Sequence, residues 1–279
     1  MIWRARKRDI DLSRQGLILG VLNVTPDSFS DGGHYISRKA AVLHGIKLIE
    51  EGADIIDIGG ESTRPGALPV STAVELARVL PIVQELRRRS NVPLSVDTYK
   101  AEIARCCLEE GADIINDITA LRGDPKMLSV AAETKAGLIL MHMQGTPCTM
   151  QQKPYYTTNV ATEVRDFLFQ RARMAVSSGV DPMSIALDPG VGFGKTFSHN
   201  RELLATLPYL TGGKYPVLVG ASRKSFLSII SGDQSVESRL WPGIALTSFC
   251  REKGVRLFRV HEPTPHREAL RMTEAILFP

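Results

Sequence analysis

The chain has 279 residues, 43% of them hydrophobic and 23% charged, with a net charge of +4 at pH 7. This length and composition fit one globular domain covering residues 1–279, because no low-complexity linker divides the sequence. The weakly basic balance gives no reason to expect a nucleic-acid partner. No apolar run approaches the roughly 18 residues of a membrane span, so no membrane partner is expected.

The N-terminus and the cysteines indicate the compartment. The first residues carry no apolar signal segment, and we expect Arg4, Arg6, Lys7 and Arg8 to lie in a short solvated basic arm, about residues 1–15. The four cysteines lack the spacing of a zinc site or a disulfide framework. We therefore expect reduced thiols in a cytoplasmic protein.

Apolar, β-branched runs alternate with amphipathic segments along the rest of the chain. Predicted strands cover residues 17–22, 54–58, 92–97, 112–116, 137–142, 184–188, 216–221 and 255–260. Predicted helices cover residues 37–51, 71–88, 102–110, 125–135, 159–178, 199–206, 224–230, 236–252 and 264–277. Eight strands with helical, right-handed connections predict a single (β/α)8 TIM barrel, whose active site lies at the C-terminal ends of the strands.

Polar side chains lie at or just beyond the end of nearly every predicted strand, where the loops of a barrel build its site. They are Asn23, Asp97, Asn116, His142, Asp188, Lys224, Arg259 and His261. Core strands seldom end this way, because a desolvated charge needs a partner. The long loops 24–36 and 59–70 follow the first two strands and are candidates for lids over the site.

Two carboxylates form the centre of the first expected group. A lone Asp is usually a helix cap or an ion-pair partner, but Asp97 and Asp188 share the barrel mouth with Asn116 and Lys224. Carboxylates suit a ligand with paired N–H donors, such as a guanidine-like edge, and an amide can donate and accept. This group predicts a pocket for a flat heterocycle.

Arg259, His261 and Asn23 form a second expected group, because the last and first strands are neighbours in a closed barrel. Arginine suits phosphate oxygens, and the amide oxygen of Asn23 suits Mg²⁺, which keeps waters and phosphate oxygens as further ligands. For His261 alone, a core histidine with satisfied hydrogen bonds remains the alternative. The group predicts a phosphate and metal site.

The glycine-rich segment from Gly190 to Thr196 is not a Walker A motif, because the spacing before the Gly-Lys pair is wrong. A turn that lets a flat ligand approach, with Phe193 as a wall, fits better. Ser225 begins the helix expected after the seventh strand, where it could cap the helix or bind a carboxylate. Met143 could pack under the ligand or in the core.

Several segments together resemble the dihydropteroate synthase family, in order from about residue 17 to 262. They are Leu22–Gly33, Gly60–Gly66, Ser95–Thr98, Ile115–Asp117, Met141–Gly145, Leu187–Lys195, Ser222–Ser225 and Arg259–His261. The resemblance implies a pterin-binding TIM barrel that condenses 7,8-dihydropterin-6-ylmethyl diphosphate with p-aminobenzoate. The implied products are 7,8-dihydropteroate and pyrophosphate, and Mg²⁺ is the implied cofactor.

The resemblance also implies roles for individual residues. The implied pterin pocket consists of Asp97, Asn116, Met143, Asp188, Lys224 and Arg259. The implied diphosphate site consists of Asn23, Thr63, Arg64, Arg259 and His261, with Asn23 as the metal ligand. The implied p-aminobenzoate site, which sulfonamides would also occupy, consists of Phe29, Pro65, Phe193, Lys224 and Ser225. The implied catalytic residues are Asp97, Lys224, Arg259 and His261, and the family implies a homodimer.

The chain departs from the family pattern in two places and leaves two alternatives open. Glu262-Pro263 follow the last motif where Asp-Val is usual, and Arg239–Ala245 replaces a commoner Gly-Ser-hydrophobic-Ala run. A methyltetrahydrofolate-dependent methyltransferase would share the pterin frame but would not need the diphosphate residues. A non-catalytic pterin-binding paralogue would bind without turnover.

Overall fold

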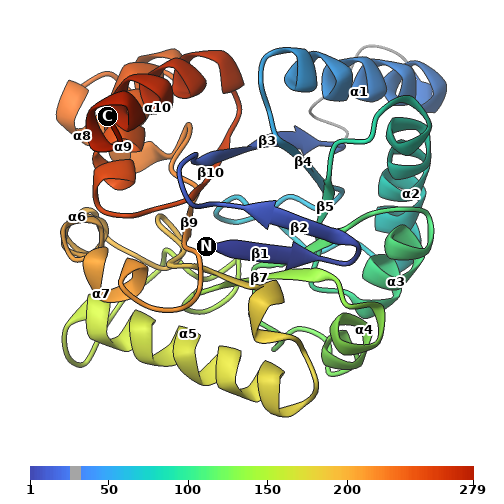
Figure 1. Ribbon diagram of the computed structural model, residues 1–279, viewed down its shortest axis with the longest axis horizontal. Coiled ribbons are helices and arrows are strands. Elements are labelled where there is room, and N and C mark those ends of the chain that lie inside the picture. Colours follow the sequence, from blue (N-terminus) through green and yellow to red (C-terminus); the bar gives the residue numbers. More distant parts are fainter. Residues whose placement is uncertain (26–32) are drawn as a thin grey trace.

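The computed structural model describes residues 1–25 and 33–279, and within them the strands build a parallel barrel surrounded by helices (Figure 1). The barrel strands are β3 (Leu17–Asn23), β4 (Ile55–Gly59), β5 (Leu94–Asp97), β6 (Ile114–Asp117), β7 (Gly137–Met141), β8 (Ile185–Asp188), β9 (Leu218–Val219) and β10 (Leu257–Val260). Their order is β8-β7-β6-β5-β4-β3-β10-β9, and a bridge between Leu187 and Val217 joins the two ends. The predicted (β/α)8 barrel is confirmed.

The helices lie outside the barrel and cover it (Figure 1). They are α1 (Gly33–Glu50), α2 (Thr72–Arg89), α3 (Ala101–Glu109), α4 (Met127–Thr134), α5 (Val160–Ser177), α6 (Phe197–Ala205), α7 (Pro208–Thr211), α8 (Ser228–Ser231), α9 (Leu240–Glu252) and α10 (Pro263–Leu277). Ser71, Asn159 and Thr196 cap α2, α5 and α6 through side-chain oxygens that accept backbone N–H groups. No helix within the described residues is long and apolar enough to cross a membrane.

The expectation of a solvated N-terminal arm was wrong. β1 (Ile2–Ala5) and β2 (Arg8–Asp11) pair as an antiparallel hairpin. Trp3 is fully buried against the barrel interior, and its indole N–H donates to the carbonyl of Ser184 at 2.8 Å. The alternation of Trp3 and Ala5 with arginines gives the hairpin one apolar face, and this face covers the N-terminal end of the barrel.

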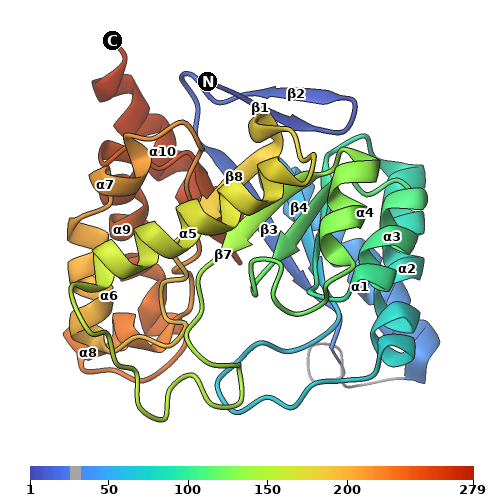
Figure 2. The same cartoon turned by 90° about the horizontal axis from the view of Figure 1, so that it is seen from below.

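The hairpin leaves the opposite end of the barrel free for the long loops. Figure 2 shows the hairpin at one end, and the loops after β4 and β7 at the other. The seventh strand is shorter than predicted: β9 covers Leu218–Val219, Val217 forms only an isolated bridge, and Pro216 has no N–H for pairing at the start of the segment. The helix predicted at 224–230 is a 3₁₀ turn, Ser225–Leu227, followed by the single turn α8.

Candidate active site

The polar residues of the barrel mouth lie one layer above the apolar barrel interior. Side chains alternate along a strand, so the residue two positions after an inward-facing one also faces inward. The apolar layer on four strands consists of Ile55, Ile114, Ala186 and Leu257. The residues two positions further along the same strands are Asp57, Asn116, Asp188 and Arg259. The strand geometry therefore brings these four polar side chains together at the carboxyl end.

Arg259 joins two carboxylates across the mouth. Its Nε donates to Asp57 Oδ2 at 2.6 Å, and its Nη2 donates to Asp97 Oδ2 at 2.8 Å. Asn116 Nδ2 also donates to Asp57 Oδ2, at 3.2 Å. The sequence-predicted residues Arg259 and Asp97 therefore meet directly, and Asn116 joins them through a residue that was not predicted from the sequence.

That residue is Asp57, which is fully buried on β4. It was overlooked because it lies inside an apolar strand and not at its exit. The strand alternation could have identified it, since Asp57 follows the inward-facing Ile55 by two positions. An aspartate at an inward-facing position of an apolar strand needs a cationic partner, and Arg259 supplies it.

The crowding of charges shifts the pKa values of this group. Burial and the negative charge of Asp57 raise the pKa of Asp97 to about 7, although Arg259 opposes the shift. Burial alone would lower the pKa of Arg259, but Asp57 and Asp97 outweigh it and hold that pKa above its ordinary value. Arg259 is therefore a permanent cation, whereas Asp97 can change protonation near neutral pH.

Asp188, Lys224 and Phe193 form the adjoining side of the mouth. Asp188 Oδ1 accepts the backbone N–H of Gly190 at 2.7 Å. Lys224 Nζ donates to the carbonyl of Val191 and lies 4.3 Å from the centroid of the Phe193 ring. Burial lowers the pKa of Lys224 to about 7, although Asp188 opposes this.

Met143 lies in a small apolar cluster beside this group. The buried members are Ile118, Met141, Met143 and Met150, and Phe193 and Tyr99 pack against them. Met143 is only 3% exposed. It therefore packs in the core next to Phe193, and its place beneath a ligand stays a prediction.

His261 marks a cationic end of the mouth. Burial and the nearby charges of Arg259, Arg223, Arg64 and Lys224 lower the pKa of His261 to about 3. Ser222 Oγ accepts the backbone N–H of His261 at 3.2 Å and lies 3.1 Å from its Nδ1. The hydroxyl can thus donate to Nδ1, which leaves the imidazole proton on Nε2. A cluster of cations around a neutral imidazole is suited to a polyanion.

Asn23, at the end of β3, lies beside Gly59 and Asp97. An added Cβ at Gly59 would lie 3.6 Å from Asp97 Oδ2 and 3.7 Å from Asn23 Oδ1, so both oxygens face the space that glycine leaves open. The described residues contain no group of three His, Cys, Asp or Glu side chains that could hold a metal ion. A single amide oxygen fits Mg²⁺, which commonly takes few protein ligands together with phosphate oxygens and water.

The loop after β4 carries three predicted residues and is fixed at both ends. Glu61 accepts from the backbone N–H of Val70 at 2.9 Å and from Lys100 Nζ at 2.6 Å, and Lys100 also donates to the Val70 carbonyl at 2.7 Å. Between these ends, Thr63 is half-buried, whereas Arg64 and Pro65 are exposed.

Two predictions for the p-aminobenzoate site stand apart from the rest. Ser225 is exposed and begins only a three-residue 3₁₀ turn, too short for a helix N-terminus to attract an anion. Phe29 lies outside the described residues. The position of Phe193 beside Lys224 is therefore the main structural feature of that proposed subsite.

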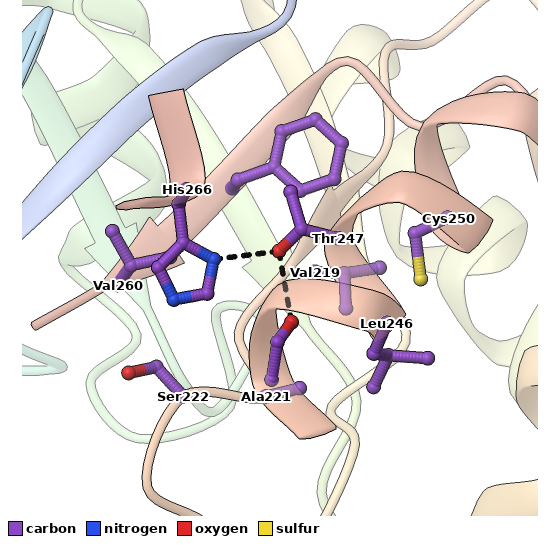
Figure 3. A pocket seen from close by; sticks show the side chains of 10 residues that line it. Val219, Ala221, Ser222, Leu246, Thr247, Cys250, Val260 and His266 are labelled. Atoms are coloured by element: carbon purple, nitrogen blue, oxygen red, sulfur yellow. Dashed lines mark hydrogen bonds between the residues drawn. The ribbon is translucent and has the colours of Figure 1, made fainter. Parts of the chain in front are cut away.

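A small cavity lies behind the cationic end, between β9, β10, α9 and α10 (Figure 3). Its volume is about 10 Å³, and its lining is mostly apolar. His266 Nδ1 lies 2.8 Å from the hydroxyl of Thr247, and burial lowers the pKa of His266 to about 4. Ser222 also lines it. The space holds no more than about one water molecule, so it is a packing defect behind the mouth.

Comparison with known proteins identifies the class and then the family. A family described as pterin binding enzyme matches residues 19–261, most of the chain. The fold and the polar mouth thus define a pterin-binding barrel enzyme. The dihydropteroate synthase of Escherichia coli is 44% identical over 273 residues, which cover 98% of this chain and 95% of that protein.

Solved structures give the same result. Dihydropteroate synthase from Xanthomonas albilineans with 4-aminobenzoic acid superposes with a TM-score of 0.93 at 40% identity and covers 100% of both chains. The Yersinia pestis enzyme in complex with a sulfonamide drug gives a TM-score of 0.93 at 41% identity, again over 100% of both chains. The chain belongs to the dihydropteroate synthases of the pterin binding enzyme family. The family inferred from the sequence motifs is confirmed.

Proposed function

We propose that this protein condenses 7,8-dihydropterin-6-ylmethyl diphosphate with p-aminobenzoate, and that the residues at the barrel mouth carry out the reaction. Membership of the dihydropteroate synthases supports the overall reaction. The observation that supports this use of the mouth is the adjacency of two chemically different ends. One end holds the carboxylates of Asp57, Asp97 and Asp188, and the other surrounds His261 with cations.

The pterin binds at the carboxylate end in this proposal. Asp188 and Asn116 supply an acceptor and a mixed donor–acceptor for the guanidine-like edge of the ring. The guanidinium of Arg259 now contacts Asp97 and Asp57. It releases Asp97 on binding and stacks on the pterin face, while Met143 packs on the other side. Without ligand, the planar guanidinium of Arg259 thus occupies the place that the planar, guanidine-like edge of the pterin takes on binding.

The diphosphate binds at the cationic end, against Arg259, His261, Thr63 and Arg64. Asn23 would hold Mg²⁺, whose charge would lower the energy of the departing diphosphate. The methylene C–O bond breaks first and its electron pair leaves with the diphosphate. A delocalised pterin cation remains, which ionised Asp97 stabilises electrostatically.

The amine of p-aminobenzoate then attacks the exocyclic methylene and forms the C–N bond. The amine is neutral at pH 7, so it needs no strong general base, and its surplus proton passes to solvent or to the departing diphosphate. Phe193 and Pro65 would flank the benzoate ring, with Phe29 a further expected wall. Lys224 and Ser225 would meet its carboxylate. Sulfonamides, as mimics of p-aminobenzoate, would occupy the same place; the Yersinia pestis relative is described as a sulfonamide drug complex.

The proposal extends to assembly and compartment. Large apolar side chains are exposed on neighbouring elements: Ile229, Val236, Trp241, Phe249, Met272 and Ile276. Such a surface favours a homodimer through α8, α9 and α10, and Trp241→Glu should then shift the sedimentation coefficient to that of a monomer. All four cysteines are unpaired, which is consistent with a reducing cytoplasm.

The deciding experiment is pyrophosphate release from the purified protein given pterin diphosphate and Mg²⁺, with and without p-aminobenzoate. We expect release that depends on p-aminobenzoate, forms dihydropteroate and falls about 100-fold or more in Asp97→Ala. Tight pterin binding without release would instead identify a binding paralogue. Release unchanged by Asp97→Ala would exclude the proposed role of that carboxylate.

A further inference from the structure

Side chains bind every carbonyl oxygen of the glycine-rich loop 190–194. Lys195 Nζ donates to the carbonyls of Gly190 and Phe193, at 2.9 and 3.0 Å. The other three donors are Lys224 to Val191, Gln151 to Gly192 at 2.7 Å, and Tyr156 to Gly194 at 3.0 Å. One lysine, which the reaction itself does not use, thus holds two of the five carbonyls.

The amino group of Lys195 is buried, which lowers its pKa to about 7, but its three hydrogen-bond acceptors favour the protonated ammonium form. The residue is 3% exposed, and its third partner is His142 Nδ1 at 3.0 Å. Burial and the positive charge of Lys195 lower the pKa of His142 to about 2, so the imidazole is neutral and can accept this bond. A lysine has three N–H donors and no acceptor, and here each donor has a partner.

Within the loop the backbone makes one turn bond, from Phe193 N–H to the Gly190 carbonyl at 3.0 Å, and Asn200 Oδ1 accepts the Gly192 N–H at 2.8 Å. Gly190, Gly192 and Gly194 all adopt positive φ, at +67°, +82° and +65°. A side chain at Gly190 would place Cβ 1.8 Å from the carbonyl oxygen of His142, so this close approach requires glycine. Three glycines in five residues give the unconstrained chain high conformational entropy. The hydrogen bonds from outside the loop must therefore hold it in place.

The position of the loop determines where two side chains lie at the mouth. Phe193 belongs to the loop, and its carbonyl is bound by Lys195. Lys224 contacts the loop twice, through the Val191 carbonyl and the Phe193 ring. A shift of the loop would therefore move the ring and the resting place of the ammonium group of Lys224 together.

We propose that Lys195 is a positioning residue for p-aminobenzoate, because it fixes the glycine-rich loop on which Phe193 and Lys224 depend. This inference rests on the proposed function. Lys195 itself touches neither substrate, since its three donors point to His142 and the loop backbone. The start of the loop has a second anchor, the bond from Gly190 N–H to Asp188, so the pterin side is affected less.

The test compares Michaelis constants for the two substrates in Lys195→Met, which keeps the chain length and removes all three donors. We expect KM for p-aminobenzoate to rise about tenfold or more, since hydrogen bonds from a charged group are lost. KM for pterin diphosphate should stay within about threefold. A purely structural role would lower the melting temperature and leave this ratio of KM values unchanged.

Arg251→Met is the matched control. Arg251 is also a buried cation that binds a backbone carbonyl, that of Arg14 at 2.9 Å, together with Glu274 at 2.7 Å. These contacts lie near the N-terminal end of β3, away from the mouth. We expect Arg251→Met to reduce stability without changing either KM.

Each outcome decides the proposal. If Lys195→Met does not fold, His142→Asn replaces it, because it disturbs one of the three partners and should still raise KM for p-aminobenzoate selectively. Parent-like KM values for both substrates in a folded variant would overturn the positioning role. An equal rise in both constants would overturn it too. If the parent protein itself releases no pyrophosphate, the proposed function fails instead.

Discussion

Replacing Asp57 by Asn tests the arrangement at the centre of the barrel mouth. Asp57 accepts from Arg259 Nε at 2.6 Å and from Asn116 Nδ2 at 3.2 Å. Asp57→Asn has nearly the same shape but no charge, and its amide N–H group would face other donors. Arg259 would then keep Asp97 as its only carboxylate partner among the contacts described for it.

The magnitude follows from the bond that is lost. A hydrogen bond between charged groups contributes about 1.5–3 kcal/mol. If this bond holds Arg259 ready for the substrate, its loss lowers kcat/KM for pterin diphosphate by roughly 10- to 150-fold, at about 1.4 kcal/mol per factor of ten. The expected fall in kcat/KM is therefore large enough to measure, and the remaining activity is high enough for a pH profile.

The pH dependence of kcat/KM tests the role of Asp57 independently, through the direction in which the profile shifts. The charge of Asp57 helps to raise the pKa of Asp97 to about 7. If ionised Asp97 is needed, kcat/KM of the parent rises with pH through this value, because the profile reports groups of the free enzyme. Neutralising Asp57 makes Asp97 easier to ionise, so the rise in Asp57→Asn should move to lower pH.

The assay is pyrophosphate release at low concentrations of pterin diphosphate, from pH 5 to 9. Asp54→Asn is the control, since Asp54 accepts the backbone N–H of Ile18 at 2.7 Å and pairs with Arg267 near the other end of β4. It should cost stability and leave kcat/KM unchanged. A kcat/KM for Asp57→Asn within about threefold of the parent, with an unmoved acidic limb, would refute the reasoning.

Three further outcomes are expected. Pyrophosphate should cause more proton uptake at pH 6 in the parent than in His261→Asn, because an anion raises the depressed pKa of His261; calorimetry in two buffers measures the difference, and equal uptake in both proteins would contradict it. Lys100→Met should speed hydrogen exchange at the Val70 amide by about tenfold, since the Glu61–Val70 N–H bond loses the lysine that also binds Glu61 and the Val70 carbonyl; unchanged exchange would show that the bond to Glu61 holds the loop without Lys100. Trp3→Ala should lower the free energy of unfolding by about 3–5 kcal/mol in urea titrations and leave kcat/KM unchanged; a loss under about 1 kcal/mol would mean that the hairpin does not seal the barrel.

The sequence by itself determined the barrel and most of the mouth. Strand and helix periodicity are local properties, so the alternation of eight apolar runs with amphipathic segments is readable along the chain. Polar residues at strand exits could be located for the same reason. Asp97, Asn116, Asp188 and Arg259 needed only the rule that parallel strands end at one face of a barrel.

The tertiary structure alone decided which of these residues are partners. Asp57 and Arg259 are 202 positions apart, and no local pattern shows that they bind each other. The same holds for Trp3 and Ser184, which are 181 positions apart. Their contact helps to hold the N-terminal segment, expected to be solvated, against the N-terminal end of the barrel. Lys195 belonged to a recognised motif, but its burial and its three acceptors depend on the folding of β7 against the glycine-rich loop. Pairing and burial are long-range properties, because they depend on which surfaces the closed barrel brings into contact.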